Sequence, residues 1–370
     1  MEKKRIYSLV LTGGPCGGKT TALCFVEEKL RSLGYNVLLV HEAATELISA
    51  GVRPKETIHP ETFQEILFTR VLQTEQLYRD IAKRLETTKE TVIIFDRGRM
   101  DMRAYTTEKH FMEILRSHGM TVVDARDKCY DGVFHLHSLA HDKESLYEEL
   151  WRSNPARSES NPAEAREKNR AVLNAWIGCP HLFVFSNDSD FETKLNRLWG
   201  SMCRVLGIPV PLEIERKFLV RCDAKAIPVQ AQKIDIEQAY LPTQKEGEEL
   251  RIRRRGKDGS WVCYMTHKFF LKHGVRSEHE HHIDAREYFE FFRNRDRNFH
   301  PIEKDRYCFV WDNQYFELDV FLAPHEGLQL LEIELTEESS AVSIPPFVEI
   351  IKEVTCDLSF SNKELSRKTA

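Results

Sequence analysis

The sequence predicts two units of different fold class: an α/β domain with a parallel sheet flanked by helices over residues 1–206, and an antiparallel β domain over residues 211–370. Strand and helix patterns alternate in the first half, and short strand patterns repeat in the second. The run Gly207-Ile208-Pro209-Val210-Pro211 separates the two halves. Each half of this chain of 370 residues is long enough to bury a core of its own.

The first domain is predicted from five short apolar runs separated by helix-like segments, the pattern of a parallel sheet. A helical pattern that begins at Lys19 and stops at Gly34 follows the first run. The expected strands are residues 6–11, 36–41, 91–95, 133–137 and 182–186.

A polar stretch over residues 142–175 carries several basic side chains among many acids. It predicts either a solvated pair of helices or a mobile lid whose arginines close on phosphates. The sequence leaves both interpretations open. The basic residues are Arg152, Arg157, Arg166, Lys168 and Arg170.

The second domain is predicted from eight strand patterns, with a helical or irregular insertion at residues 286–299. The expected strands are residues 212–221, 233–241, 249–255, 261–268, 275–283, 306–311, 315–321 and 328–335.

Composition limits the function classes. A formal net charge of −5 argues against general nucleic-acid binding, so no nucleic-acid partner is expected. Nine cysteines without CxxC spacing, no secretory signal and no apolar run of membrane-spanning length predict a reduced, cytoplasmic protein without a transmembrane segment.

A phosphate-binding loop follows the first predicted strand and opens the first helix. Its glycines let backbone N–H groups approach phosphate, and the helix N-terminus adds partial positive charge. We expect Lys19 to reach the β and γ phosphates and Thr20 to bind Mg²⁺. Cys16 is either a small filler or a redox-sensitive thiol. The nucleotide-binding residues predicted are Gly13, Gly14, Cys16, Gly17, Gly18, Lys19, Thr20 and Thr21.

Two carboxylates follow other strands of the same sheet and are candidate catalytic residues. Asp96 ends its strand where a carboxylate commonly lies near Mg²⁺, although a surface turn is an alternative. Glu42 is either a base facing a phosphate acceptor or a cap of the next helix. No Asn-Lys-x-Asp string is present to read guanine, so the bound nucleotide is ATP or GTP.

Charged residues occupy alternate positions of the strands predicted in the second domain. In a strand, residues two apart share a face, so Glu213, Glu215 and Lys217 point together, as do Arg251 and Arg253. On one strand this pattern indicates a solvated face. Its recurrence with both signs on many strands favours a closed sheet with a hydrated, ionic interior, because unpaired charges in a dry core are costly.

These motifs resemble those of the CYTH domains, or triphosphate tunnel metalloenzymes. The resemblance begins at Glu213-x-Glu215-x-Lys217 and continues through Arg251-Ile252-Arg253, Thr266-His267-Lys268, Arg276, Lys304-Asp305-Arg306, Glu317-Leu318-Asp319 and Glu332-Ile333-Glu334. It implies an α+β domain with an eight-stranded antiparallel tunnel. In that tunnel Mg²⁺ or Mn²⁺ activates the water that attacks a terminal phosphate.

The same resemblance implies a role for each charged residue. Metal would be held by Glu213, Glu215, Asp319, Glu332 and Glu334. Triphosphate would be held by Lys217, Arg251, Arg253, Lys268, Arg276, Lys304 and Arg306, with Lys217 also a catalytic candidate.

The order of a phosphate loop and a tunnel domain also resembles the TRPL translocation defect proteins. That likeness implies binding of GTP and of phosphoinositide head groups, with peripheral association at a membrane.

Three functions therefore remain open. The first is metal-dependent hydrolysis of a nucleoside triphosphate or inorganic polyphosphate. The second is a GTP- and phosphoinositide-binding regulator of membrane-protein trafficking. The third is a small-molecule kinase that uses the tunnel as a scaffold.

Overall fold

The structure is a computed structural model that divides into two compact units, Met1–Leu206 and Gly207–Ala370. It describes residues 5–152, 161–208, 214–243, 248–272, 275–335, 341–355 and 357–368. Within these ranges, side chains are described except those of residues 142, 149–152, 214, 269–272 and 275–279.

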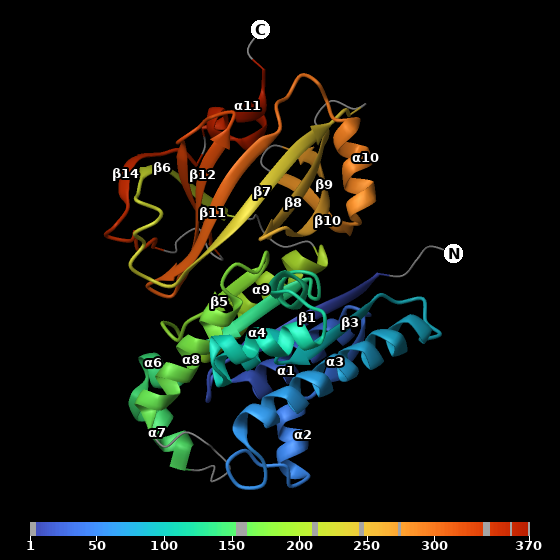
Figure 1. Ribbon diagram of the computed structural model, residues 1–370, viewed down its shortest axis with the longest axis vertical. Helices are drawn as coiled ribbons and strands as arrows, with labels where there is room; N and C mark the ends of the chain where they lie inside the picture. Colours follow the sequence, from blue (N-terminus) through green and yellow to red (C-terminus); the bar gives the residue numbers. More distant parts are fainter. Residues whose placement is uncertain are drawn as a thin grey trace. The chain divides into compact units, whose positions relative to one another are not determined.

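The N-terminal unit is built on a five-stranded sheet in the order β2-β3-β1-β4-β5, and all its ladders are parallel (Figure 1). This confirms the predicted parallel α/β class. The strands are β1 (Ile6–Gly13), β2 (Asn36–Val40), β3 (Thr91–Asp96), β4 (Gly132–Leu136) and β5 (Leu182–Phe185).

Helices surround this sheet because its strands are apolar on both faces, as parallel strands usually are. Leu9, Ile93 and Phe134 in its centre are fully buried. Helices α1 and α9 contact each other, and the 3-10 segment η1 contacts α3, α4, α5 and α8. The helices are α1 (Lys19–Ser32), α2 (Ala43–Ser49), α3 (Pro60–Arg84), η1 (Arg99–Tyr105), α4 (Glu108–Ser117), α5 (Val122–Arg126), α6 (Leu139–Asp142), α7 (Glu144–Arg152), α8 (Pro162–Trp176) and α9 (Phe191–Leu206).

The C-terminal unit is a nine-stranded sheet in the order β10-β9-β8-β7-β11-β12-β13-β6-β14, and all its ladders are antiparallel (Figure 1). Its strands are β6 (Ile214–Arg221), β7 (Ala231–Leu241), β8 (Glu248–Lys257), β9 (Ser260–Lys272), β10 (Val275–Ile283), β11 (Ile302–Trp311), β12 (Gln314–Ala323), β13 (Gln329–Leu335) and β14 (Glu349–Glu353). Its helical segments are α10 (Ala285–Arg293), η2 (Leu358–Phe360) and α11 (Asn362–Ser366).

The strand count corrects the predicted eight-stranded sheet. Strand β14 was missed because Glu349–Glu353 is short, charged at both ends and exposed throughout, so it lacks the alternation that marks a half-buried strand. Between the described residues no ladder joins β10 to β14, so backbone hydrogen bonds leave the sheet open.

One face of this sheet is apolar and is covered by other segments of the unit. On β7–β9, Ala239, Ile252 and Cys263 pack beneath Tyr288 of α10. On β6, β11, β12 and β13, the apolar face packs against Val348 and Phe347. The opposite face carries a set of paired charges that includes Lys217, Arg306, Asp319 and Glu332.

Candidate functional site

The predicted phosphate loop connects β1 to α1. Gly18 is the N-cap of α1 and has a φ of 83°, and Gly13 has a φ of 143°. A Cβ on Gly13 would stand 2.0 Å from the carbonyl oxygen of Leu136 at the end of β4. Glycine is therefore required there, because a larger residue would push the loop off the sheet.

Lys19 lies against the loop that it follows. Its Nζ is 3.4 Å from the carbonyl oxygen of Gly13 and 3.1 Å from that of Gly14. Burial, and then the positive charge of Arg97, lower the pKa of Lys19 to about 8. The first turn of α1 also exposes Thr20 and Thr21. An ammonium group at a helix N-terminus, beside exposed hydroxyls, is suited to polyphosphate.

Glu42 and Arg97 form an ion pair at the ends of β2 and β3. Arg97 Nε is 2.5 Å from a carboxylate oxygen of Glu42, and Arg97 Nη1 is 3.2 Å from the Gly13 carbonyl oxygen. Glu42 occupies the N-cap position of α2, but its side chain makes no capping bond to the backbone. Burial pushes the pKa of Glu42 upward, but Arg97, Thr45 and Lys19 outweigh burial, so the pKa lies below its ordinary value. The Glu42 carboxylate is thus engaged by Arg97 and Thr45, and its role as a base stays a prediction.

Asp96 lies at the end of β3 near Lys19. Its Oδ1 is buried and makes no hydrogen bond. Burial, and then Glu42, raise the pKa of Asp96, while Lys19 and Arg97 oppose that rise. A buried carboxylate oxygen without a partner is a suitable donor for a hard cation, so Asp96 fits the expected Mg²⁺.

Two residues that the sequence interpretation missed hold this loop in place. Asp101, buried on η1, accepts hydrogen bonds from Thr12 Oγ1, the Gly98 N–H and Trp176 Nε1, and pairs with Arg97. Asn169 on α8 accepts one from the N–H of Gly14 at 3.2 Å. Neither residue belongs to a local motif, and Asn169 is far from the loop in sequence. Only the tertiary fold identifies them.

Residues 142–175 were predicted to form either a solvated pair of helices or a mobile lid, and they include a helix that packs into the unit. Helix α8 is an integral part of the unit, since Val172, Leu173 and Trp176 are buried. Arg166 pairs with Glu144 at 2.7 Å. Lys168 lies over the ring of Tyr105, 4.6 Å from its centroid. The side chains of Arg152 and Arg157 lie outside the described residues.

In the C-terminal unit, strand register brings opposite charges together on one face of the sheet. Lys217 on β6 is opposite Glu332 on β13, which is opposite Glu317 on β12. Arg306 on β11 is opposite Asp319 on β12. The period-2 alternation predicted from sequence places all five side chains on the same face.

Asp319 is the centre of one charge cluster on this face. Its side chain is 0% exposed, and it accepts hydrogen bonds from Lys304 Nζ at 2.5 Å and Arg306 Nε at 2.6 Å. Arg306 also pairs with Glu317 and, at 3.0 Å, with Glu332. Both oxygens of Asp319 contact cations, so in this structure Asp319 is their counter-ion.

Lys217 lies between carboxylates of neighbouring strands. Its Nζ is 2.9 Å from Glu332 and 3.4 Å from Glu215. Burial lowers the pKa of Lys217, but Glu332 and Glu215 outweigh it, so the net pKa is raised. Lys217 therefore keeps its proton at neutral pH and is a cation.

The sheet curls strongly enough for its distant strands to interact. Burial, and then Glu332, raise the pKa of Glu215 on β6, while Lys217 and then Lys268 on β9 lower it. Strands β6 and β9 are separated in sheet order by β13, β12, β11, β7 and β8. The sheet therefore curves toward this face, which brings Lys268 near enough to Glu215 to affect its pKa.

Arginines of β8 line the other side of this concave face. Arg253 Nη2 is 2.9 Å from Glu280 Oε2 on β10, and that oxygen also accepts from Thr266 Oγ1 at 2.8 Å. Arg251 is 3.3 Å from Thr266 Oγ1. The predicted Arg276 side chain and all of Glu213 lie outside the described residues.

The predicted metal ligands are only partly brought together. Glu334 is directly opposite Glu215 in the ladder, next to Glu332. Within the part of the chain that the structure describes, no three acid, His or Cys side chains form a group that could hold a metal ion. Carboxylate oxygens are donors that hard divalent cations prefer, so Glu215, Glu332 and Glu334 are of a chemistry that fits Mg²⁺ or Mn²⁺.

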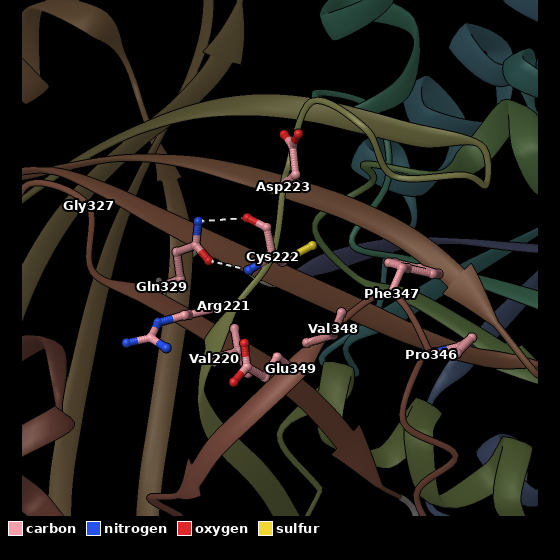
Figure 2. A pocket seen from close by; sticks show the side chains of 10 residues that line it. All are labelled: Val220, Arg221, Cys222, Asp223, Gly327, Gln329, Pro346, Phe347, Val348 and Glu349. Atoms are coloured by element: carbon pink, nitrogen blue, oxygen red, sulfur yellow. Dashed lines mark hydrogen bonds between the residues drawn. The ribbon is translucent and has the colours of Figure 1, made fainter.

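A separate groove of about 660 Å³ lies at the ends of β6 and β13 (Figure 2). Figure 2 shows Gln329 bonded to the backbone of Cys222, accepting from its N–H at 2.7 Å and donating to its carbonyl at 2.9 Å. No residue of the predicted sites lines this groove.

Comparison with known proteins relates the chain to two groups. A family model described as an AAA domain matches residues 8–194. An inorganic triphosphatase of Nitrosomonas europaea is 34% identical over 160 residues, which are 42% of this chain and 96% of that protein. An inorganic triphosphatase of Acetivibrio thermocellus is 32% identical over 157 residues, which are 41% of this chain and 92% of that protein.

One solved structure similar to the chain is a crystal structure of an inorganic triphosphatase. Its sequence identity is 32% and its TM-score is 0.33, with 43% of this chain and 97% of that chain covered. Among the described helices, none combines the length and apolar character that crossing a membrane requires.

Proposed function

Because the chain belongs to the AAA domain family through residues 8–194 and to the family of the inorganic triphosphatases that it matches, we propose a triphosphatase joined to a nucleotide-binding unit. The C-terminal unit hydrolyses a triphosphate with the help of a divalent metal ion. The N-terminal unit binds ATP or GTP at the loop Gly13–Thr21. We assign the triphosphatase likeness to the C-terminal unit because the family model already accounts for residues 8–194.

The observation that carries the proposal is the concave charged face. A triphosphate is a chain of several negative charges, and Lys217, Arg306 and Arg253 are cations on facing sides of the curled sheet. Each cation already faces a carboxylate, which lowers the cost of holding it away from bulk water. Guanidinium groups suit phosphate because they donate in a fixed, planar geometry.

Basic and acidic residues of this face have different proposed roles. Arg251, Arg253, Lys304 and Arg306 hold phosphate oxygens and orient the chain. Lys217 keeps its proton and stabilises the charge that develops on the phosphate that leaves. Glu215, Glu332 and Glu334 would hold Mg²⁺ or Mn²⁺, which would supply Lewis-acid polarisation of the phosphoryl group. Asp319 keeps Lys304 and Arg306 in position.

In the N-terminal unit, the loop geometry supports nucleotide binding. Backbone N–H groups at the start of α1 and the ammonium of Lys19 provide the phosphate site. Asp96 and Thr20 are the proposed Mg²⁺ ligands, because Asp96 has a buried oxygen without a hydrogen bond. Glu42 is held in an ion pair with Arg97 at 2.5 Å, so we do not assign it the role of base in a kinase reaction.

The test is phosphate release from inorganic triphosphate, ATP and GTP with Mg²⁺ or Mn²⁺. Lys217→Ala should lower kcat/KM by roughly 100-fold or more, the cost typical of removing one donor from a charged transition state. Arg216→Ala is the matched control, because Arg216 directly precedes Lys217 in β6 and pairs on the other face with Glu353 at 2.7 Å. Lys19→Ala should leave hydrolysis of inorganic triphosphate unchanged.

Equal activity of Lys217→Ala and wild type would exclude the concave face as the active site. The alternative of a GTP- and phosphoinositide-binding trafficking regulator, and the likeness to the TRPL translocation defect proteins, gain no support from these comparisons. They stay predictions.

A further inference from the structure

An exposed aromatic side chain lies directly beside the phosphate loop. Phe191 opens α9, follows the loop after β5, and is 40% exposed. A Cβ on Gly18 would stand 2.5 Å from Phe191 Cε2 and 2.8 Å from its Cζ. Glycine at position 18 therefore lets the edge of this ring rest on the backbone at the point where α1 begins.

The ring lies where the nucleoside of a bound nucleotide would emerge. Phosphates bind at the N-terminus of α1, and Gly18 is the N-cap of that helix. The exposed Thr20 and Thr21 form the next part of the same surface. A base attached through its ribose to the phosphates at Lys19 is within reach of a ring that touches Gly18. Such an exposed, flat, apolar surface suits stacking, because every nucleobase has a π face.

Two polar side chains of the loop after β5, those of Asn187 and Asp188, are engaged in the fold. Asn187 donates to the Ser138 carbonyl at 3.0 Å and accepts from Lys194 at 2.6 Å. Asp188 pairs with Arg197 at 3.1 Å. Because these groups hold the loop, they are not poised to read the hydrogen-bonding edge of a base. Binding by the ring alone would not distinguish adenine from guanine.

We propose that Phe191 is the stacking platform for the nucleobase of a nucleotide bound at the Gly13–Thr21 loop, and that this site accepts ATP and GTP with similar affinity. The inference rests on the proposed nucleotide binding by the N-terminal unit. It adds the residue that holds the base and the lack of strong base selection.

The experiment replaces Phe191 in the full chain. Phe191→Trp keeps a stacking surface and adds a reporter, so ATP and GTP should quench its emission with half-saturation concentrations within about threefold of each other. Inorganic triphosphate has no base and should not quench it. The same signal should vanish when Lys19→Ala is added.

Phe191→Leu is the matched variant, because leucine still covers Gly18 but has no aromatic face. The binding of labelled ATP that depends on Lys19 should weaken by about 5- to 150-fold, the range that stacking contributes to base binding. A thermal melt close to that of wild type would show that the loop is still folded. Phe191→Trp should restore the affinity.

The outcomes separate the two proposals. Wild-type ATP affinity in Phe191→Leu, together with loss of binding in Lys19→Ala, would overturn the stacking role and leave the nucleotide site standing. Binding of ATP that is unaffected by Lys19→Ala would overturn the nucleotide site, and the stacking role with it. Equal quenching of Phe191→Trp by inorganic triphosphate would also overturn the stacking role.

Discussion

Asp319→Asn tests the charge cluster of the C-terminal unit most sharply. The substitution keeps the size of the side chain but removes its charge. Asp319 is 0% exposed and is bonded to Lys304, which is 2% exposed, and to Arg306. An amide cannot compensate two cations, and its NH₂ group would face one of them. We expect the C-terminal unit to lose stability because buried positive charge is left unpaired.

The magnitude follows from the burial of the partners. Breaking a buried ion pair by removal of one partner typically costs about 3–5 kcal/mol. For a unit of this size, each kcal/mol lowers Tm by about 2–4 °C, so Tm should fall by roughly 6–20 °C. Calorimetry of the full chain measures this change. The transition of the C-terminal unit is identified as the one that inorganic triphosphate shifts upward.

A matched control uses a carboxylate on the surface. Glu353→Gln removes the charge that pairs with Arg216, and Glu353 is 43% exposed, so its expected cost is at most about 1 kcal/mol. Added triphosphate should stabilise Asp319→Asn more than wild type, because the ligand supplies the missing negative charge. A fall in Tm no larger than that of Glu353→Gln would refute the reasoning.

Three further predictions follow from the described geometry. Gly13→Ala should unfold or strongly destabilise the N-terminal unit, because the new Cβ would lie 2.0 Å from the Leu136 carbonyl oxygen. Thermal melts check this, with Gly34→Ala as the comparison, because no atom lies within 4 Å of a Cβ at Gly34. An unchanged melt for Gly13→Ala would contradict the prediction. ATP binding should be accompanied by proton uptake near pH 8, because phosphate favours the charged form of Lys19, whose pKa is about 8. Calorimetry in buffers of different ionisation enthalpy measures this uptake. A heat of binding that does not depend on the buffer would count against the prediction. Glu215→Gln should raise stability at pH 7 while lowering metal-dependent activity. The pKa of Glu215 is higher in the folded than in the unfolded protein, so its ionisation costs stability as the pH rises from the unfolded to the folded pKa. The stability gained by Glu215→Gln should therefore disappear in acid, where Glu215 is protonated in both states. Denaturant melts at pH 7 and in acid test this, and an equal gain at both pH values would be the contrary result.

Local patterns predicted much of the N-terminal unit. The parallel sheet followed from short apolar runs, and the phosphate loop followed from glycine spacing next to a strand and a helix. Asp101 and Asn169 could not be predicted, because they act on the loop through contacts made only in the folded chain. The ion pair between Glu42 and Arg97 was also hidden in the sequence, although it helps to lower the pKa of Glu42.

In the C-terminal unit, alternation predicted which residues share a face but not how their charges pair. Asp319 matches a metal-ligand motif in sequence, yet its oxygens contact Lys304 and Arg306. That pairing depends on strand order and register, which period-2 alternation does not encode. Strand β14 escaped prediction for a different reason, since edge strands need not bury an apolar face.

The most direct test of the central claim is a crystal structure of the full chain with a non-hydrolysable imido analogue of triphosphate and Mn²⁺. The account predicts phosphate oxygens within hydrogen-bond distance of Arg253, Arg306 and Lys217, with Mn²⁺ between phosphate and Glu332 or Glu215. Analogue bound elsewhere on the C-terminal unit, with the concave face still closed by its own ion pairs, would contradict it.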